Sequence, residues 1–379
     1  MAGRADNGEL CGGRLTIDLG AIIANWRDLD RRSRPGRAAA VVKADAYGLG
    51  AHRVVPALAS AGCDSFFVAL PGEGVAIRPL VPEARIFVLN GAHADTMDAM
   101  IEAGLIPILC SMEQARFWLA QGGGTACAIQ VDTGMNRLGL TVGEAYTLAS
   151  DDTLRGKLDI VHVMSHFACA DTPDHPLNRQ QIESFQAVAA AFESVESSLS
   201  NSAATLTGGA HGFAMTRPGI ALYGGEAVPG IANSMRPVVT LKARIVQIRS
   251  ALSGETVSYG ATQRLDRDSR IAIASVGYAD GYPRAGSGSG VPLRNAVAEG
   301  LCGFVARHRA PVLGRVTMDL TAFDVTDVPD AALAEGWIEL IGPNRSLDDV
   351  ARASGTIGYE ILTSLGTRYA RRYRGEGRN

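Results

Sequence analysis

Short apolar runs recur along the first part of the chain and alternate with stretches that have helical periodicity. The runs are AAAVVK (38–43), SFFVAL (65–70), RIFVLN (85–90), IPILC (106–110), ACAIQV (126–131), DIVHVMSH (159–166), the weaker SSLSNSA (197–203) and GIALYGG (219–225). Runs of this length are typical of strands buried on both faces, as in a parallel sheet. Eight strand–helix units predict an α/β fold with a TIM-like (β/α)8 barrel, and an open doubly wound sheet is the alternative.

The pattern changes near Arg236–Pro237, where strands separated by turns follow one another with little helix between them. This arrangement predicts a mainly β domain. Two helical stretches, SLDDVARASG and TIGYEILTSLGTRYARRY, close the chain, with Ser346 and Thr356 as candidate N-caps. The sequence thus predicts a polar tail at 1–13, a barrel domain at 14–236, and a C-terminal mainly β domain with terminal helices at 237–379.

The composition, with 46% hydrophobic and 20% charged residues, is that of an ordinary globular protein. A net charge of −3 gives no electrostatic reason to expect nucleic acid or an anionic membrane as a partner. The six cysteines are scattered without a CxxC pair, so we expect no metal site and no disulfide framework, and a reducing cytoplasm is favoured. The N-terminal segment lacks the apolar core of a signal peptide, so we expect neither secretion nor membrane insertion.

A lysine closes the first apolar run. Catalytic groups of barrels lie at the C-terminal ends of the strands, and Lys43 in VVKADAYGLG occupies that position. A partly desolvated lysine has a lowered pKa, and its neutral amine can attack a carbonyl and bind it covalently. A lysine that reaches solvent or forms a salt bridge is the alternative. Tyr47 lies near Lys43 if a helical turn follows the strand, and otherwise it is a packed aromatic residue.

Possible phosphate ligands follow the last predicted strands. Gly219 and Ile220 in RPGIALYGG can present adjacent backbone N–H groups after the eighth run, where such barrels often bind phosphate. Ser202 in SNSAA adds a hydroxyl donor from the end of the seventh run. A glycine turn without a ligand is the alternative.

Three basic residues at other strand ends are candidates for the same site. His166 ends the sixth run, Arg137 lies in VDTGMNRLGL after the fifth, and Arg217 lies in TRPG. An arginine keeps its charge and offers donors to oxygen or ring-nitrogen acceptors. A buried core histidine and structural ion pairs are the alternatives.

In the predicted β domain, Tyr278 lies beside an Asp-Gly turn and Met318 lies in GRVTMDL. Taken alone, both are ordinary turn and strand-end residues. Together with the barrel motifs, however, they resemble the alanine racemase family, whose members have a barrel and a β domain and use pyridoxal phosphate. The matching segments, in order from residue 41 to 373, are VVKADAYGLG, VDTGMNRLGL, SHFACAD, SNSAA, RPGIALYGG, VSYGAT, GYADGYPR, GRVTMDL and TIGYEILTSLGTRYARRY.

The resemblance implies interconversion of L- and D-alanine with pyridoxal 5′-phosphate, supplying D-alanine for peptidoglycan. Lys43 would bind the cofactor aldehyde covalently. Arg217 would face its pyridine nitrogen, and Arg137 and His166 would also lie beside the cofactor. The groups implied to hold the cofactor phosphate are Tyr47, Ser202, Tyr359 and the N–H groups of Gly219 and Ile220.

Racemisation removes a proton from one face of Cα and returns one to the other face, so it needs two acid–base groups. The resemblance implies that Lys43 serves the D-enantiomer. Tyr278, from a partner subunit and hydrogen-bonded by His166, would serve the L-enantiomer. Arg137 and the backbone of Met318 would bind the substrate carboxylate. A homodimer with active sites shared across its interface is therefore implied.

Alternatives remain within and beyond this class. Another small amino acid, such as serine, is a possible substrate. A non-catalytic pyridoxal-phosphate-binding homeostasis protein shares the barrel but generally lacks the β domain. Basic amino-acid decarboxylases share the two-domain plan but use a carboxylate where this chain has Arg217. Gln130 stands where many family members carry a modified lysine, so the positioning of Arg137 stays open.

Overall fold

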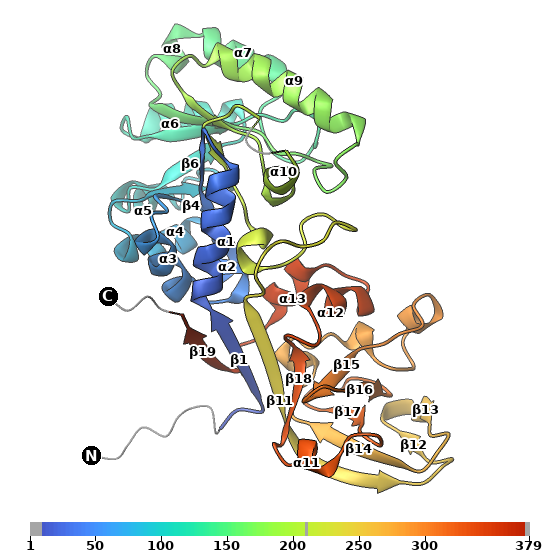
Figure 1. Cartoon of the computed structure of the whole chain (residues 1–379). Helices are drawn as coiled ribbons and strands as arrows, with labels where there is room; N and C mark the ends of the chain where they lie inside the picture. The colour runs from blue at the N-terminus through green and yellow to red at the C-terminus, as the bar shows by residue number, and fades with distance from the viewer. Residues whose placement is uncertain (1–9, 209–210, 376–379) are drawn as a thin grey trace, which may run out of the picture. The chain divides into compact units, whose positions relative to one another are not determined.

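The computed structural model describes residues 10–208 and 211–375, which form two compact units (Figure 1). One unit is Ile22–Arg236, and the other combines residues 10–21 with residues 237–375. The polar tail predicted at 1–13 falls mostly on residues 1–9, which lie outside the described residues.

The Ile22–Arg236 unit contains a nine-stranded parallel sheet in the order β2-β10-β9-β8-β7-β6-β5-β4-β3. Its strands are β2 (Arg37–Ala38), β3 (Ala40–Val41), β4 (Ser65–Val68), β5 (Arg85–Val88), β6 (Ile106–Leu109), β7 (Cys127–Gln130), β8 (Ile160–Met164), β9 (Glu196–Ser198) and β10 (Met215–Thr216). Only Ala39 separates β2 from β3, so both ends of the sheet belong to one chain segment and the sheet closes on itself. The predicted TIM-like barrel is confirmed.

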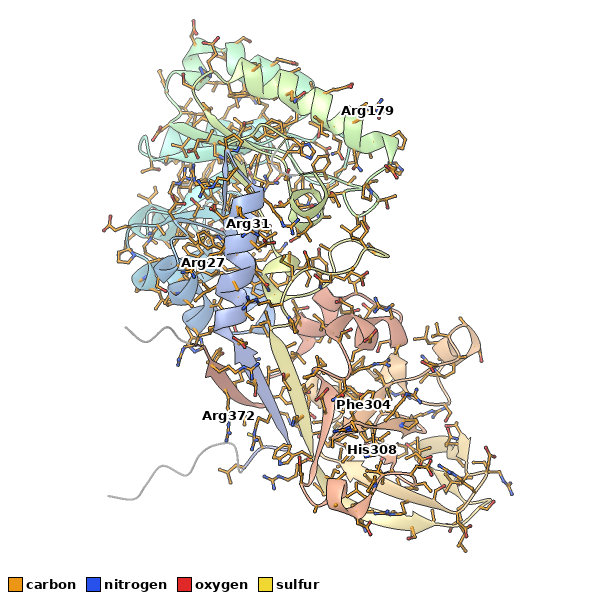
Figure 2. All side chains as sticks on the ribbon, in the orientation of Figure 1. Arg27, Arg31, Arg179, Phe304, His308 and Arg372 are labelled. Carbon is orange, nitrogen blue, oxygen red and sulfur yellow. The ribbon has the colours of Figure 1, made fainter. Side chains whose placement is uncertain are left out.

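Helices and helical turns follow most of the barrel strands. They are α1 (Leu19–Arg32), α2 (Lys43–Gly48), α3 (Ala51–Ser60), α4 (Pro71–Ile77), η2 (Arg78–Leu80), α5 (Met97–Glu102), α6 (Met112–Gln121), α7 (Val142–Ser150), α8 (Asp152–Arg155), α9 (Pro176–Ala191), α10 (Ser202–Thr207) and η3 (Ile220–Tyr223). In α1, Ile22, Trp26 and Leu29 are buried at helical spacing, whereas Arg27 and Arg31 are exposed (Figure 2). An apolar stripe of this kind lets a helix cover the sheet.

The last two predicted barrel strands differ from those in the structure. The run at 219–225 forms the 3₁₀ helix η3, and the strand is instead the two-residue β10 that precedes Arg217. Pro218 has no N–H to donate to a ladder, although its carbonyl still accepts from the Val41 N–H at 3.0 Å, and the strand does not continue into 219–225. The run at 197–203 is divided, because β9 ends at Ser198 and α10 begins at Ser202. Periodicity does not distinguish a short buried strand from a short buried helix.

The second unit is built on an eight-stranded sheet in the order β14-β17-β16-β15-β18-β11-β1-β19, with a separate β12–β13 hairpin. Its elements are β1 (Gly13–Asp18), β11 (Val239–Ala251), β12 (Thr256–Val257), η4 (Tyr259–Ala261), β13 (Gln263–Arg264), β14 (Ser269–Ala274), η5 (Tyr278–Asp280), η6 (Arg284–Gly286), η7 (Pro292–Asn295), β15 (Cys302–Val305), β16 (His308–Leu313), β17 (Thr321–Asp324), α11 (Asp330–Leu333), β18 (Trp337–Ile341), α12 (Leu347–Ala353), α13 (Gly358–Ser364) and β19 (Ala370–Arg374). Phe304 and His308 mark neighbouring β15 and β16 in Figure 2. The predicted mainly β domain is confirmed.

Both ends of the described chain join this second sheet, which the sequence did not predict. The strand β1, expected at the start of the barrel domain, pairs antiparallel with β11 and parallel with β19. The helix expected to run to residue 373 ends at Ser364, and β19 occupies the edge beside β1. The cap predicted at Ser346 is confirmed, whereas the N-cap position of α13 is Ile357 and not Thr356, and Ile357 makes no side-chain cap. No helix in the described ranges is long and apolar enough to cross a membrane.

Candidate active site

Four predicted basic residues lie close together in the barrel unit. Burial and the charge of Arg137 lower the pKa of the Lys43 amine, while Glu73 raises it. Burial, Arg217, Arg137 and Lys43 together lower the pKa of His166 to about 3, so its imidazole is neutral near pH 7. Because these groups act on one another electrostatically, the structure gathers Lys43, Arg137, His166 and Arg217 into one cluster.

Lys43 lies just beyond β3, as predicted, but the turn that follows is left-handed. Residues 44–47 all have φ between 52° and 56° and ψ between 39° and 53°. This conformation costs roughly 1–2 kcal/mol for each residue other than glycine. Such strain persists only where the surroundings determine the backbone, and it is commonly found at functional sites. The turn keeps Tyr47 buried and ends at Gly48 and Gly50, which also have positive φ.

The carboxylate of Glu73 holds the start of this turn. Its Oε1 accepts a hydrogen bond from the Ala44 N–H at 2.6 Å. Its Oε2 accepts from the N–H groups of Ala69 at 2.8 Å and Leu70 at 3.1 Å, where β4 gives way to α4. Glu73 therefore joins the backbone next to Lys43 to the neighbouring strand.

We expect Glu73→Ala to change both stability and the chemistry of Lys43. The variant leaves the Ala44 N–H without its acceptor, at a cost of about 1–3 kcal/mol. It also removes the charge that raises the pKa of Lys43, so that pKa should fall further. Glu144 closes a similar capping box on α7 through Thr141, so Glu144→Ala is the matched control. The rate of lysine acylation in apoprotein can be measured by mass spectrometry at a series of pH values. The pH at which Lys43 becomes reactive should shift downward in the Glu73 variant and stay unchanged in the Glu144 variant. Equal profiles in both variants contradict this role.

Arg217 lies directly after β10 and is only 3% exposed. Its Nη2 donates to the Ser165 carbonyl at 2.5 Å and lies 3.4 Å from Nδ1 of His166. Its Nη1 donates to the Ser198 hydroxyl. Burial lowers its pKa to about 9, which leaves the guanidinium charged at neutral pH. The side chain is therefore a buried cation fixed in one orientation.

Three of the predicted phosphate ligands also meet. The Ser202 hydroxyl oxygen accepts from the N–H groups of Gly219 at 2.8 Å and Ala221 at 3.3 Å. A Cβ on residue 219 would collide with the Tyr47 hydroxyl, so only glycine fits there. Ile220 follows at the start of η3, where the first N–H groups have no partner within the helix. Hydroxyls and backbone N–H groups thus converge at one point.

Arg137 lies on the loop after β7, and this loop is held by its own backbone contacts. The Asp132 carboxylate accepts three N–H groups of the loop, including that of Arg137 at 3.2 Å. The buried Gln130 side chain donates to the Leu138 carbonyl at 2.8 Å. Gln130 therefore holds the backbone of the loop. The Arg137 side chain itself is exposed.

In the second unit, Tyr278 and Met318 lie on two loops that hydrogen-bond to each other. The N–H of Tyr278 donates to the Thr317 carbonyl and that of Ala279 donates to the Met318 carbonyl, both at 3.0 Å. A Cβ on Gly277 would collide with these two carbonyls, so glycine permits the close approach. The side chains of Tyr278 and Met318 are 43% and 54% exposed.

Arg368 ties the same two loops together. Its Nε lies 3.1 Å from Oδ1 of Asp280, and its Nη1 lies 2.8 Å from Oδ1 of Asp319. Asp280 is buried, and its second oxygen accepts from the Gly277 N–H at 2.9 Å. Tyr278 and Met318 are thus presented by one cross-linked assembly. Tyr359 lies on α13, and its predicted phosphate contact stays a prediction.

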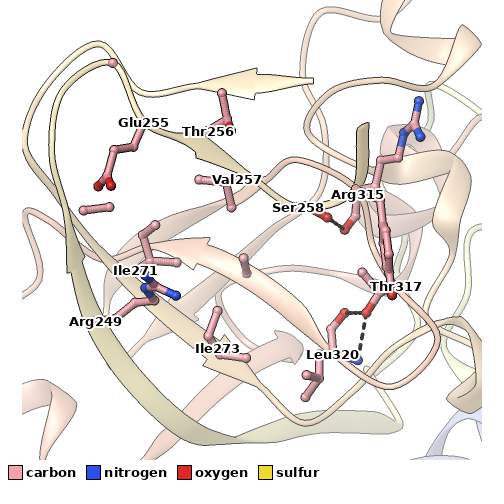
Figure 3. Close-up of a pocket in the computed structure, with 14 residues that line it drawn as sticks. Arg249, Glu255, Thr256, Val257, Ser258, Ile271, Ile273, Arg315, Thr317 and Leu320 are labelled. Atoms are coloured by element: carbon pink, nitrogen blue, oxygen red, sulfur yellow. Dashed lines mark hydrogen bonds between the residues drawn. The ribbon is translucent and has the colours of Figure 1, made fainter. Parts of the chain in front are cut away.

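A cavity of about 620 Å³ lies beside the Met318 loop (Figure 3). The residues that line it include the apolar Ile271 and Leu320 and the basic Arg249 and Arg315. The predicted site residues do not line this cavity.

Comparison with known families covers both units. The sequence model of the alanine racemase N-terminal domain matches residues 17–227, and that of the alanine racemase C-terminal domain matches residues 238–373. The chain belongs to the alanine racemase family.

Individual alanine racemases agree with this assignment along nearly the whole chain. A biosynthetic alanine racemase of Agrobacterium fabrum is 56% identical over 364 residues, which is 95% of this chain and 93% of that protein. The alanine racemase of Rhizobium meliloti is 53% identical over 366 residues, or 96% of this chain and 97% of that protein. The crystal structure of the Bartonella henselae alanine racemase with covalently bound pyridoxal phosphate has a TM-score of 0.87 and 35% identity, covering 96% and 99% of the two chains.

The alanine racemase family, its two-domain fold class and its classification as a pyridoxal-phosphate racemase were all predicted from the sequence. These predictions are confirmed at the level of the family. The sequence predictions missed Glu73, which binds the backbone N–H next to Lys43, and they missed Ser198 and His162, which form a chain of contacts from Arg217. His162 stands four residues before His166, and alternation along a strand places both on one face. This four-residue spacing could have predicted that His162 faces the same side of the strand as His166.

Acid should destabilise this protein through His162 and His166. Burial lowers the pKa of both to about 3 from an ordinary 6.5. The unfolded chain therefore binds more protons between these values. The contribution of the neutral rings to the free energy of unfolding is complete above about pH 6.5. It falls by about 1.4 kcal/mol per pH unit for each ring as the pH is lowered toward 3. Urea unfolding at pH 7, 6 and 5 should show a shallower pH dependence for His162→Phe than for wild type. Identical slopes contradict the prediction.

Proposed function

We propose that this chain interconverts L- and D-alanine with pyridoxal 5′-phosphate bound to Lys43, as a cytoplasmic homodimer that supplies D-alanine for peptidoglycan. The observation that carries the proposal is the cluster of Lys43, Arg217 and His166 at the strand ends of a closed barrel. It lies in a chain whose two domains both match alanine racemases.

The barrel residues fit the cofactor. Tyr47, Ser202 and Gly219 form a cradle that has no room for a Cβ on residue 219, and its hydroxyl and N–H donors suit a phosphate. Lys43, with its lowered pKa, presents an amine suited to covalent binding of an aldehyde. When bound, pyridoxal phosphate withdraws electrons from the substrate and thereby makes its Cα–H acidic.

Arg217 favours racemisation over other reactions through the cofactor's pyridine nitrogen. A guanidinium donates hydrogen bonds but keeps its proton, so Arg217 would hold the cofactor's ring nitrogen without protonating it. Such a contact would limit electron withdrawal by the cofactor and would favour return of a proton to Cα over other fates of the substrate. This property separates the chain from the decarboxylases that place a carboxylate at that position.

Proton transfer is divided between two faces of Cα. The Lys43 amine moves the proton on one face, and the partner subunit's Tyr278 moves it on the other. The surroundings of His166 keep its imidazole neutral, and one nitrogen of this neutral ring is available for a hydrogen bond to that phenol. Arg137 and the backbone of the partner's Met318 bind the substrate carboxylate. The rigid pairing of the Tyr278 and Met318 loops supports joint delivery of both groups.

The direct test is formation of D-alanine from L-alanine, detected with a D-amino-acid oxidase and followed with and without added pyridoxal phosphate. Starting from apoenzyme, we expect D-alanine to form only after pyridoxal phosphate is added, and we expect kcat/KM for alanine to exceed that for serine. A preference for serine overturns the choice of substrate. Cofactor binding without any racemisation favours the homeostasis protein instead, although such proteins generally lack the C-terminal β domain present here.

A further inference from the structure

A buried row of polar side chains leads away from Arg217 into the barrel. The Arg217 Nη1 reaches the Ser198 hydroxyl on β9, and that hydroxyl lies 2.6 Å from Nε2 of His162 on β8. Ser198 and His162 are both completely buried. The rings of Phe87 and Phe67 pack beside the imidazole, with centroids 5.5 and 6.4 Å away.

The chemistry of the three groups gives this row one direction. Arginine can only donate, so the Ser198 oxygen accepts from Arg217. The hydroxyl keeps one hydrogen that it can donate to Nε2 of His162, and this direction requires the His162 tautomer with its hydrogen on Nδ1. A neutral histidine that accepts at Nε2 carries its hydrogen on Nδ1. The pKa of His162, lowered by burial and by Arg217, keeps the ring neutral, in agreement with this tautomer.

The far end of the row faces an acidic residue. Nδ1 of His162 is buried without a hydrogen-bond partner among the described residues and lies 4.0 Å from Oε2 of Glu196. Glu196 is opposite His162 in the β8–β9 register. Arg37 and Arg85 each donate to Glu196 at 2.8 Å and hold its carboxylate in place. A carboxylate facing Nδ1 favours the hydrogen on that nitrogen.

We propose that His162 is a positioning residue for Arg217, acting through the Ser198 hydroxyl. The row holds one arm of the guanidinium, as the Ser165 carbonyl holds the other. With both arms held, the long side chain loses its freedom to rotate, so its free edge is aimed in one direction. The proposal rests on the proposed function because the group at which that edge is aimed is the pyridine nitrogen of the cofactor.

The test compares cofactors with and without that nitrogen. Dissociation constants are measured by titrating apoenzyme with pyridoxal phosphate and with its 1-deaza analogue, in which C–H replaces the ring nitrogen. The variants are Ser198→Ala, His162→Phe and His162→Gln, whose amide oxygen can take the place of Nε2. Ser33→Ala is the matched control, because it removes a buried hydroxyl that bonds Thr216 at 2.6 Å, next in sequence to Arg217.

We expect Ser198→Ala and His162→Phe to weaken binding of pyridoxal phosphate at least tenfold while binding of the deaza analogue changes less than twofold. His162→Gln should restore most of the lost affinity, and Ser33→Ala should leave the ratio of the two constants unchanged. Equal losses for both cofactors, or no difference between His162→Phe and His162→Gln, overturn the proposal, since either shows that His162 only fills space.

A second measurement needs neither cofactor nor activity. Nitrogen-15 spectra of histidine-labelled apoprotein should show His162 with its hydrogen on Nδ1 and no titration between pH 5.5 and 9, and Ser198→Ala should alter its Nε2 shift. A hydrogen on Nε2 overturns the proposal. If wild-type protein binds neither cofactor, the proposed function fails, while these spectra still decide whether the row exists.

Discussion

Tyr278→Phe should abolish exchange of the α-hydrogen of L-alanine with deuterated solvent while exchange of D-alanine continues. Removing the phenolic oxygen deletes the acid–base group on one face of Cα, and Lys43 still serves the other face. Loss of such a group costs about 10²–10⁴-fold in rate. Proton NMR of each enantiomer in deuterated buffer, with cofactor content checked by absorbance, separates the two half-reactions.

The control for this variant is Tyr146→Phe on α7, because Tyr146 is 41% exposed, close to the 43% of Tyr278. It should exchange both enantiomers at the wild-type rate. If Tyr278→Phe exchanges L-alanine at the wild-type rate, Tyr278 does not move that proton and the division of labour between the two faces is wrong.

Lys43→Ala should remove both covalent cofactor binding and racemisation. Lys43 is proposed to hold the cofactor and to move one of the two protons, so the loss in kcat should exceed about 10⁴-fold, above the usual contribution of one acid–base group. Borohydride reduction of wild-type holoenzyme followed by peptide mapping should place the cofactor on Lys43. The chain has only two other lysines, Lys157 and Lys242, so the assignment is simple.

The exposed Lys157 gives the matched control, and Lys157→Ala should retain both label and activity. Labelling of Lys157 or Lys242 in wild type would show that the covalent site is elsewhere.

Mixing the two inactive variants tests whether the sites are shared. In a heterodimer of Lys43→Ala with Tyr278→Phe, one site has lost both groups and the other retains both. Unfolding and refolding the chains together should therefore restore activity, up to about a quarter of the wild-type value for random pairing. No recovery after verified exchange of subunits means that each site is built within one chain.

Much of the barrel was predictable because its strands are short apolar runs separated by amphipathic helices. The failures have local causes. The run at 219–225 is as apolar as a strand, but Pro218 before it offers no N–H to a ladder and the run folds as a buried 3₁₀ helix. The last helix was extended through residues 370–374, which instead pair with β1, some 350 residues away in sequence. Such pairing depends on which edge strand is free in the folded sheet, and the local propensity of residues 370–374 does not predict it.

The candidate site also has features that could be predicted from the sequence and features that could not. Lys43, Arg217 and His166 could be identified because strand ends in a barrel converge whatever their spacing in sequence. The left-handed turn at 44–47 could not, because alanine and tyrosine carry no preference for that conformation and only the surrounding contacts, such as that of Glu73, hold it.

By itself, the sequence determined the family, the two-domain plan and the residues with reactive chemistry, because these depend on residue type and order along the chain. Only the tertiary structure decided which polar groups support the reactive residues. Glu73 on Ala44, Ser198 and His162 behind Arg217, and Arg368 between two loops are contacts between distant segments. Their donors and acceptors find each other only after the hydrophobic core has fixed the strands in register.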